Sequence, residues 1–403
     1  GVDEFSTQST APTTTTTKYI YILYNKGVDE KMKLICEKDK ILKALNSVTK
    51  AVAVRTTMPI LEGVLIEAEN NKLKLTTNDL EIGTEHSMDC KTIENGKTVV
   101  ELKTLNEIVR RIEDEEVEIL VENNLFVLKS VNGIFKLATM NPNEYPKLPI
   151  FDVENSITIK QKLLKDMIRR TLFAVSTDEN RPIYMGALLK VENNILTIVA
   201  VDGFRLALRK SINEENINDF KVIIPGKVLS ELLKVLNDDE ESKVKIGVNK
   251  NQALFEMGKS ILVSRIIEGE FLNYNTIIPD SYETKVKVKT KSLLDSFERV
   301  ALFAKENKEK DRKAPLKMNI GIDGIVLSCI SDAGDAKEGV QAIVEGKDIE
   351  IGFNPRYVID ILKVIDDSEI YVEFTSSISP VLIKPVNSKE YIYVVLPIKL
   401  RQN

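Results

Sequence analysis

Residues 41–45 read Ile-Leu-Lys-Ala-Leu, and similar segments recur as Leu-Leu-Lys-Asp-Met-Ile at 163–168 and Leu-Leu-Asp-Ser-Phe at 293–297. In each segment apolar residues recur at helical spacing behind a short extended stretch. The equivalent leucines, Leu42, Leu164 and Leu294, are 122 and 130 residues apart. Self-similarity at a fixed period indicates one structural unit repeated along the chain.

A second apolar helix pattern recurs in the same order, over residues 105–112, 229–236 and 358–365. The last one begins at Asn354-Pro355, a helix-capping residue followed by a proline suited to the first helical position. Alternating β-branched runs separated by turn residues predict antiparallel strands around these helices. We therefore expect an α+β fold with three repeated domains, each of antiparallel sheets and two helices, over residues 32–151, 152–281 and 282–403.

The first 31 residues differ from the rest of the chain, because a run of five threonines follows Pro12. They lack the charged start and the long apolar core of a secretory signal. We expect residues 1–31 to be an appended, disordered leader, with Met32 as the natural start of the protein.

The composition excludes several classes of protein. Acidic residues outnumber basic ones, 61 to 56, which argues against a chain that grips phosphates over its whole surface. Three scattered cysteines and a single histidine exclude the usual zinc spacings and a disulfide framework, and they indicate reduced thiols in the cytoplasm. No apolar run approaches the roughly 20 residues of a membrane span, so we expect no membrane partner, and no metal or cofactor.

Basic residues recur at one place in the repeats. Each second helix carries two cations seven residues apart, on one face and opposite the apolar stripe. These pairs are Lys103 and Arg110, Lys227 and Lys234, and Arg356 and Lys363. The first helix adds Lys40, Lys43 and Lys50 in repeat one and Lys162, Lys165 and Arg169 in repeat two, whereas Asp295 and Glu298 weaken the pattern in repeat three.

Solvated helix faces are the ordinary explanation of such cations. Their recurrence in three repeats favours a second explanation, a phosphate-facing wall built from the helices of all repeats. The acidic excess would then lie elsewhere, and it is densest just after two of the second helices, at residues 113–116 and 238–241.

The motifs of common enzymes are absent from the sequence. It has no glycine-rich phosphate loop, no HExxH zinc motif and no G-x-S-x-G nucleophile motif. We interpret His86 as a surface histidine. Asp332, Asp335 and Glu338 could form a magnesium site, but we interpret them as a solvated loop. The chain is therefore expected not to be an enzyme.

Four segments, at residues 55–61, 201–207, 351–357 and 394–400, have distinctive sequences. They read Arg-Thr-Thr-Met-Pro-Ile-Leu, Val-Asp-Gly-Phe-Arg-Leu-Ala, Ile-Gly-Phe-Asn-Pro-Arg-Tyr and Val-Val-Leu-Pro-Ile-Lys-Leu. With the threefold repeat, they make residues 32–400 resemble the bacterial DNA polymerase III beta subunits, the DNA sliding clamps. The resemblance implies a head-to-tail homodimer that forms a six-domain ring, with helices inside, around double-stranded DNA of any sequence. It also implies a non-catalytic processivity factor that an external ATP-driven loader opens.

The resemblance also implies sites. A pocket between domains two and three would receive short linear peptides of the replicative DNA polymerase, the clamp loader and repair proteins, at Tyr184, Gly203, Phe204, Arg205, Leu206, Pro279, Asn354, Tyr357, Val394, Leu396, Pro397 and Ile398. Phe135 and Leu137 of one subunit would meet Leu302 and Phe303 of the other, although by residue type alone the first two are more typical of a core. Arg55 matches a DNA-contacting position of the family, and Lys227 is a weaker candidate.

Three features depart from the family pattern. Phe204 stands where members often have histidine or tyrosine, Lys399 stands where arginine is common, and residues 401–403 extend past the customary end. We expect these departures to affect the choice of partners. The alternative is a protein-only scaffold that does not encircle DNA, which would explain the pocket and the repeats but not the recurrent cations.

Overall fold

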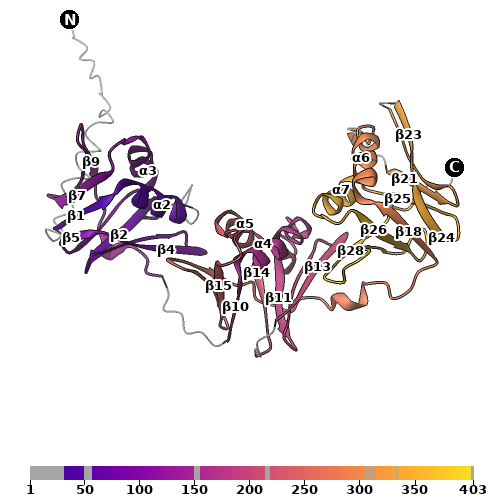
Figure 1. The fold of residues 1–403 in the computed structure, drawn as a ribbon, viewed down its shortest axis with the longest axis horizontal. Coiled ribbons are helices and arrows are strands. Elements are labelled where there is room, and N and C mark those ends of the chain that lie inside the picture. The colour runs from indigo at the N-terminus through magenta and orange to yellow at the C-terminus, as the bar shows by residue number, and fades with distance from the viewer. Residues whose placement is uncertain are drawn as a thin grey trace, which may run out of the picture. The chain divides into compact units, whose positions relative to one another are not determined.

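The structure, a computed structural model, describes residues 31–49, 57–148, 155–213, 218–304, 306–307, 312–313, 315–332 and 334–400. Residues 1–30 of the predicted leader, Lys50, Arg55 and the tail at 401–403 lie outside the described residues. Contacts divide the chain into two compact units, which are taken separately below (Figure 1). The first runs to Asp79 and continues over Glu85–Lys147, and the second comprises Leu80–Thr84 and Leu148–Asn403.

The described residues of the first unit form two α-helices and two runs of antiparallel strands. Its helices are α2 (Lys38–Val48) and α3 (Leu102–Arg111), with short 3-10 turns η2 (Pro59–Glu62) and η3 (Pro142–Glu144). One sheet has the order β5-β1-β7-β8-β9, built from β1 (Met32–Glu37), β5 (Lys91–Glu94), β7 (Glu116–Glu122), β8 (Leu125–Lys129) and β9 (Ile134–Ala138). The other strands pair in the order β4-β3-β2-β6, built from β2 (Gly63–Glu69), β3 (Lys72–Asn78), β4 (Ile82–Asp89) and β6 (Gly96–Glu101).

The apolar stripes of the two helices form the core of this unit. Ile41 and Leu45 of α2 and Leu105 and Val109 of α3 are fully buried, and they pack on residues of both sheets such as Phe126. The spacing of these residues is that of an amphipathic helix, which buries one stripe and leaves its polar face to solvent. The two helices predicted for the first repeat are therefore confirmed.

The second unit contains the elements of two repeats. Its helices are α4 (Gln161–Arg169), α5 (Gly226–Val235), α6 (Thr290–Ala301) and α7 (Pro355–Lys363), with 3-10 turns η4 (Leu172–Ala174), η5 (Pro182–Met185) and η6 (Tyr274–Thr276). A four-stranded run has the order β10-β15-β16-β17, from β10 (Asn155–Lys160), β15 (Lys243–Val248), β16 (Gln252–Met257) and β17 (Ser260–Arg265). A second sheet has the order β23-β22-β21-β25, from β21 (Leu316–Gly321), β22 (Gly324–Ser331), β23 (Gly334–Val340) and β25 (Ile349–Phe353). A short pair is formed by β19 (Glu306–Asn307) and β20 (Arg312–Lys313).

A nine-stranded sheet joins the two repeats of the second unit. Its order is β14-β11-β12-β13-β28-β27-β26-β18-β24. The first four strands belong to repeat two: β11 (Gly186–Glu192), β12 (Ile195–Val201), β13 (Arg205–Ile212) and β14 (Phe220–Pro225). The other five belong to repeat three: β18 (Thr284–Lys289), β24 (Ala342–Gly346), β26 (Glu369–Phe374), β27 (Val381–Pro385) and β28 (Tyr391–Val395).

The seam between the repeats is the antiparallel pair β13–β28, in which Leu206 lies opposite Val394 and Arg209 lies opposite Tyr391. Because side chains alternate along a strand, Leu206 and Leu208 point to one face of the sheet and Arg205 and Arg209 point to the other. Leu206, Leu208 and Val394 join one buried apolar cluster. The seam therefore has an apolar face and a face that carries buried cations.

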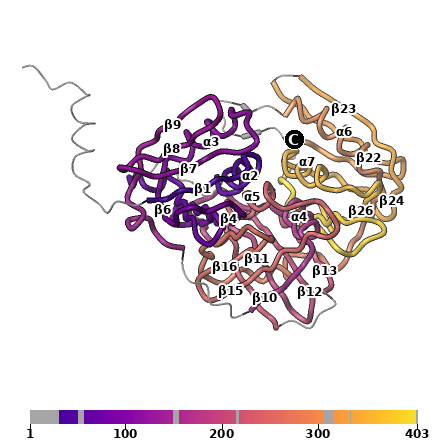
Figure 2. The backbone as a smooth tube through the Cα atoms, turned by 60° about the vertical axis from the view of Figure 1, so that its left-hand side comes forward, coloured from indigo at the N-terminus to yellow at the C-terminus, as the bar shows by residue number. Residues whose placement is uncertain are grey.

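The remaining predicted helices are also confirmed. The side chain of Asn354 accepts a hydrogen bond from the amide of Arg356, and Pro355 occupies the first turn of α7, as the sequence predicted. Helices α6 and α7 of repeat three run side by side (Figure 2). With antiparallel ladders throughout, these elements confirm the α+β class. Within the described residues, no helix has the length and apolar character needed to cross a membrane.

Candidate functional site

A cavity of about 350 Å³ opens at the end of the seam where β13 begins and β28 ends. Seven of the twelve residues predicted for the peptide pocket line it: Tyr184, Gly203, Phe204, Arg205, Leu206, Val394 and Leu396. The backbone supports this arrangement, because the amide of Leu396 donates to the carbonyl of Phe204 at 2.8 Å just beyond the paired strands. This hydrogen bond holds the start of β13 and the end of β28 together at the rim of the cavity.

The walls of the cavity are mostly aliphatic, and its rim is exposed. Phe204 is 54% exposed and Leu396 is 36% exposed, and such large apolar side chains in one patch are typical of a protein-binding surface. The polar groups are few: the guanidinium of Arg181 and the phenol of Tyr184, whose ring packs edge-on against Phe271. A concave apolar site with a few polar groups can bind apolar anchors and fix their orientation.

Arg205 is a structural residue of this pocket. Its guanidinium is buried, and it donates to Asp202 at 2.9 Å, to Asp360 at 2.6 Å and to the carbonyl of Phe173 at 2.9 Å. It also lies 4.7 Å from the ring centroid of Tyr357. Because each of its three guanidinium nitrogens already donates to the protein, we expect Arg205 to shape the wall of the cavity rather than to bind a peptide directly.

Five predicted pocket residues do not line the cavity: Pro279, Asn354, Tyr357, Pro397 and Ile398. Tyr357 adjoins it, because its ring stacks on Phe204 with centroids 5.6 Å apart. Burial and the carboxylate of Asp202 raise the pKa of Tyr357, so its phenol is neutral. Asn354 caps α7, and the amide of Ile398 donates to the carbonyl of Gly352 at 2.8 Å.

Four lining residues were missed by the sequence analysis: Arg181, Val201, Leu272 and Ile277. Val201 is the first residue of the distinctive segment at 201–207, but it was not named as a pocket residue. Leu272 and Ile277 lie between β17 and β18, in a stretch with no helical or strand periodicity. No pattern in the sequence marked that stretch as a wall of the pocket.

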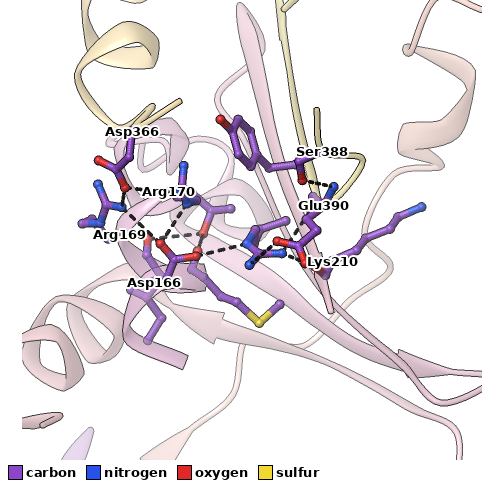
Figure 3. A network of polar contacts seen from close by, with 12 residues as sticks. Asp166, Arg169, Arg170, Lys210, Asp366, Ser388 and Glu390 are labelled. Atoms are coloured by element: carbon purple, nitrogen blue, oxygen red, sulfur yellow. Dashed lines mark hydrogen bonds and ion pairs between the residues drawn. The ribbon is translucent and has the colours of Figure 1, made fainter. Parts of the chain in front are cut away.

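The face of the seam that carries Arg209 has a network of ion pairs (Figure 3). Asp166 of α4 accepts from Arg170 at 2.8 Å and from Arg209 of β13 at 3.1 Å. Arg170 also donates to Asp366 and to the carbonyl of Val364, both just after α7. Burial alone would raise the pKa of Asp166, but Arg170 and Arg209 outweigh it and hold that pKa below its ordinary value. The network therefore joins the helices and strands of the two repeats.

The residues predicted for a subunit contact lie on or near the edge strands of two sheets. Phe135 and Leu137 are on β9, the last strand in the order of its sheet, and both are half-buried against the core of the first unit. Phe135 also lines a groove of about 650 Å³ along α3 together with Lys103, Ile108 and Arg111. Leu302 is 69% exposed after α6, and Phe303 packs beside Gly334 at the start of β23.

The predicted DNA-facing cations are exposed or half-buried, but most carry local counter-charges. Arg110 pairs with Glu107 at 2.6 Å, Lys234 with Glu231 at 2.7 Å, and Lys363 with Glu298 at 2.9 Å. Lys162 reaches Glu240 at 2.5 Å, Arg169 is held by Asp166 and Asp366, and Arg356 lies 3.9 Å from Asp360. Exposed pairs of this kind contribute little stability, so phosphate oxygens can replace the carboxylates. Lys103 and Lys227 are also exposed, and Arg55 lies outside the described residues.

The interpretation of the acidic patch as a solvated loop was wrong in part. Asp332 lies in the turn, but Asp335 and Glu338 belong to β23, which pairs with β22. Glu338 accepts hydrogen bonds from Arg299 at 3.0 Å and from Ser296 at 2.7 Å, and those bonds keep its pKa low. Among the described residues, no group of three or more histidine, cysteine or acidic side chains could hold a metal ion. His86 lies in β4 and is half-buried.

Comparison with known proteins identifies three consecutive family domains. The model of the N-terminal domain of the DNA polymerase III beta subunit matches residues 32–149, that of the central domain matches 158–273, and that of the C-terminal domain matches 275–399. The matches cover most of the chain in the order of the three repeats.

Whole-length relatives agree with these matches. The beta sliding clamp of Halalkalibacterium halodurans is 34% identical over 383 residues, which span 91% of this chain and all of the relative. The crystal structure of the Bacillus subtilis sliding clamp is 34% identical, with a TM-score of 0.87 over 92% of this chain and all of that one. A Pseudomonas aeruginosa sliding clamp bound to griselimycin is 26% identical, with the same TM-score over the same shares. The chain belongs to the DNA polymerase III beta subunit family, the DNA sliding clamps.

Proposed function

We propose that this chain, a non-catalytic DNA sliding clamp, works as a homodimeric ring of three-domain subunits that encircles duplex DNA of any sequence. The pocket at the seam would take short linear peptides of the replicative polymerase, the clamp loader and repair proteins. We place this activity in the cytoplasm, on the nucleoid. The observation that carries the proposal is the β13–β28 seam, because one pairing there both joins two repeats and forms a cavity with an exposed apolar rim.

The seam also supplies a template for ring closure. In repeat three, β28 is the last strand, and its equivalent in repeat one is β9. In the seam β28 pairs with β13, the strand of repeat two that follows the turn at Asp202. The strand of repeat three that corresponds to β13 is β23, which follows the turn at Asp332. Both β9 and β23 stand at the end of a strand order. Edge strands offer backbone donors and acceptors to another chain, so β9 of one subunit would pair with β23 of the other.

Such a contact is heterologous, and two of them close a ring when the rotation between subunits permits. The side chains near the two edges suit it. Leu302 exposes an apolar side chain near β23, while Phe135 and Ile108 line the groove beside β9. Burial of Leu302 in a groove of this kind would contribute about 1.5–3 kcal/mol at each of the two contacts.

The peptide site follows from the walls of the cavity. An extended peptide would place leucine or phenylalanine anchors against Leu206, Val394 and Ile277, and a backbone carbonyl or an acidic group near Arg181. Phe204 has no hydrogen-bonding group in its side chain, so its contribution is an apolar surface that Tyr357 supports by stacking. We therefore expect peptides to be selected mainly by their apolar anchors.

Each contact between the ring and the DNA would be weak. Exposed cations on the helices can exchange their carboxylate partners for phosphates, and such contacts carry no direct sequence information. A closed ring needs no tight grip, so the duplex can slide within it. A polymerase tethered to the ring has a raised effective concentration at the primer end, to about the millimolar range for a short linker.

The test is retention on DNA. The cognate loader and ATP would place the protein on a nicked circle, and the salt concentration would then be raised. We expect the protein to stay on the circle and to leave quickly when the same DNA is cut once, because salt suppresses ordinary phosphate binding. Equal, salt-sensitive loss from circles and linear DNA would leave only the protein-binding scaffold.

A further inference from the structure

Two of the three cysteines face each other in the first unit. Strands β1 and β5 are antiparallel, and Leu34 lies opposite Thr92 and Ile35 opposite Lys91. Continuing this register by one residue places Cys36 opposite Cys90. Both side chains pack on the same apolar cluster, as expected because residues directly opposite each other in an antiparallel pair point to the same face.

The backbone hydrogen bonds show which kind of pair this is. The amide of Cys90 donates to the carbonyl of Asn71 at 3.0 Å, and therefore not to β1. On the other strand, the amide of Lys38 donates to the carbonyl of Glu115 at 2.8 Å. Because the direction of the backbone groups repeats every two residues along a strand, the amide and carbonyl of Cys36 also point toward β7. Cys36 and Cys90 are thus a non-hydrogen-bonded pair, in which Cα atoms are about 4.5 Å apart. Disulfides span Cα distances of about 4.4–6.8 Å.

We infer that Cys36 and Cys90 form a redox-active dithiol that a small-molecule disulfide can oxidise to an intramolecular disulfide bond. Cys90 reacts first, because it is half-buried whereas Cys36 is buried. Its thiolate attacks one sulfur of the oxidant, the S–S bond breaks, and one small thiolate leaves. The thiolate of Cys36 then attacks Sγ of Cys90 and releases the second small thiolate. The two cysteine protons end on the two released thiols, and the oxidant takes up two electrons.

The surroundings make this reaction slow and selective. Burial, together with the neighbouring Cys90, raises the pKa of Cys36 to about 12. Burial also raises the pKa of Cys90, although the hydroxyl of Thr92, 3.4 Å from its sulfur, opposes that shift. Few thiolates are therefore present at neutral pH, and the bond forms because the strand register holds the second cysteine opposite the first. This inference does not depend on the proposed DNA and peptide contacts.

The test uses the full chain, folded, with oxidised glutathione as the probe. After acid quenching and alkylation under denaturing conditions, mass spectrometry should find a product that carries two fewer alkyl groups than the reduced protein, and a non-reducing digest should link Cys36 to Cys90. Dithiothreitol should reverse the change. C329S should react in the same way, because Cys329 is a buried residue of the other unit. C36A should stop at a glutathione mixed disulfide on Cys90.

A second measurement separates native proximity from chance. Cys36 and Cys90 are 54 residues apart in the chain, so in urea they meet only by closing a long loop. The equilibrium ratio of linked to reduced protein at a fixed glutathione ratio should be at least about tenfold higher in the native protein than in urea. A wild-type product that stops at glutathionylated Cys90, links two chains, or forms equally well in urea would overturn the inference.

Discussion

The guanidinium of Arg205 donates to the carboxylate of Asp360 at 2.6 Å, which joins strand β13 of repeat two to helix α7 of repeat three. The same guanidinium lies against Tyr357, and Tyr357 in turn stacks on Phe204 at the rim of the pocket. The geometry of the rim therefore depends on a helix from the following repeat. A pocket built in this way is complete only while the seam between the repeats stays closed.

Replacing Asp360 by asparagine should loosen both the seam and the rim. Arg205 is 8% exposed, and the substitution removes a charged partner from a buried cation, at a cost of about 1–3 kcal/mol. Urea unfolding would measure this loss, and a fluorescent peptide with leucine and phenylalanine anchors should bind several-fold more weakly. D238N removes an exposed carboxylate that pairs with Lys165, and it should leave both quantities unchanged. Unchanged peptide affinity in D360N would disprove the role of Arg205 in the rim.

Gly203→Ala should damage the same pocket through the backbone. Gly203 has a φ of +93°, a conformation that costs other residues about 1–2 kcal/mol. An added Cβ would also lie 2.9 Å from the guanidinium of Arg181, which would have to move out of the cavity. G321A is the matched control, since a Cβ there meets Asp348 only at ordinary contact distance. Peptide titration should show weaker binding for G203A alone, and equal affinities would contradict this account.

Asp166→Asn should lower stability in a pH-dependent way. The pKa of Asp166 is held below its ordinary value in the folded protein, so its contribution is present above the unfolded pKa of about 3.9 and is lost as the pH falls through the folded value. We expect D166N to be destabilised by about 1–3 kcal/mol at pH 7, because Arg170 and Arg209 lose a charged partner. The difference in the free energy of unfolding between D166N and the wild type should shrink below about pH 4. Urea unfolding across this pH range would measure this difference. A difference that does not change with pH would contradict the lowered pKa of Asp166.

The exposed helix cations should determine the salt dependence of DNA binding. Each of K234A and K363A should reduce the slope of log affinity against log salt concentration by about 0.9 if that lysine contacts a phosphate. The control is K245A, on the exposed side of strand β15. Fluorescence anisotropy would measure binding to a short duplex over a series of salt concentrations, and the slopes would come from these affinities. Slopes equal to that of K245A would show that Lys234 and Lys363 face solvent and contact no phosphate.

The sequence predicted the repeated elements because periodicity is a local property. The helices were found from apolar residues that recur at helical spacing, as in Leu105 and Val109. The prediction for Asp335 and Glu338 failed because acidic residues rarely favour strands, whereas pairing with β22 and the bonds to Arg299 override that tendency.

Contacts between distant segments were not predictable from one sequence. The ion pair between Lys162 and Glu240 joins residues 78 positions apart, and no local pattern indicates it. The pairing of Cys36 with Cys90 depends on a register shift between Lys33 and Leu34, which only the ladder reveals. The resemblance to the clamp family named much of the pocket, but Leu272 and Ile277 lie outside its motifs.

The central claim is that two subunits close a ring through β9 and β23 around DNA. Its most direct test is topological linkage after cross-linking. Lys136 lies on β9 and Lys337 on β23, so a lysine-reactive cross-linker can join the proposed edges of a loaded dimer. After denaturation in detergent, the protein should remain on intact circular DNA and should be released by a single double-strand cut. Release from intact circles by detergent, with the subunits cross-linked, would contradict the ring.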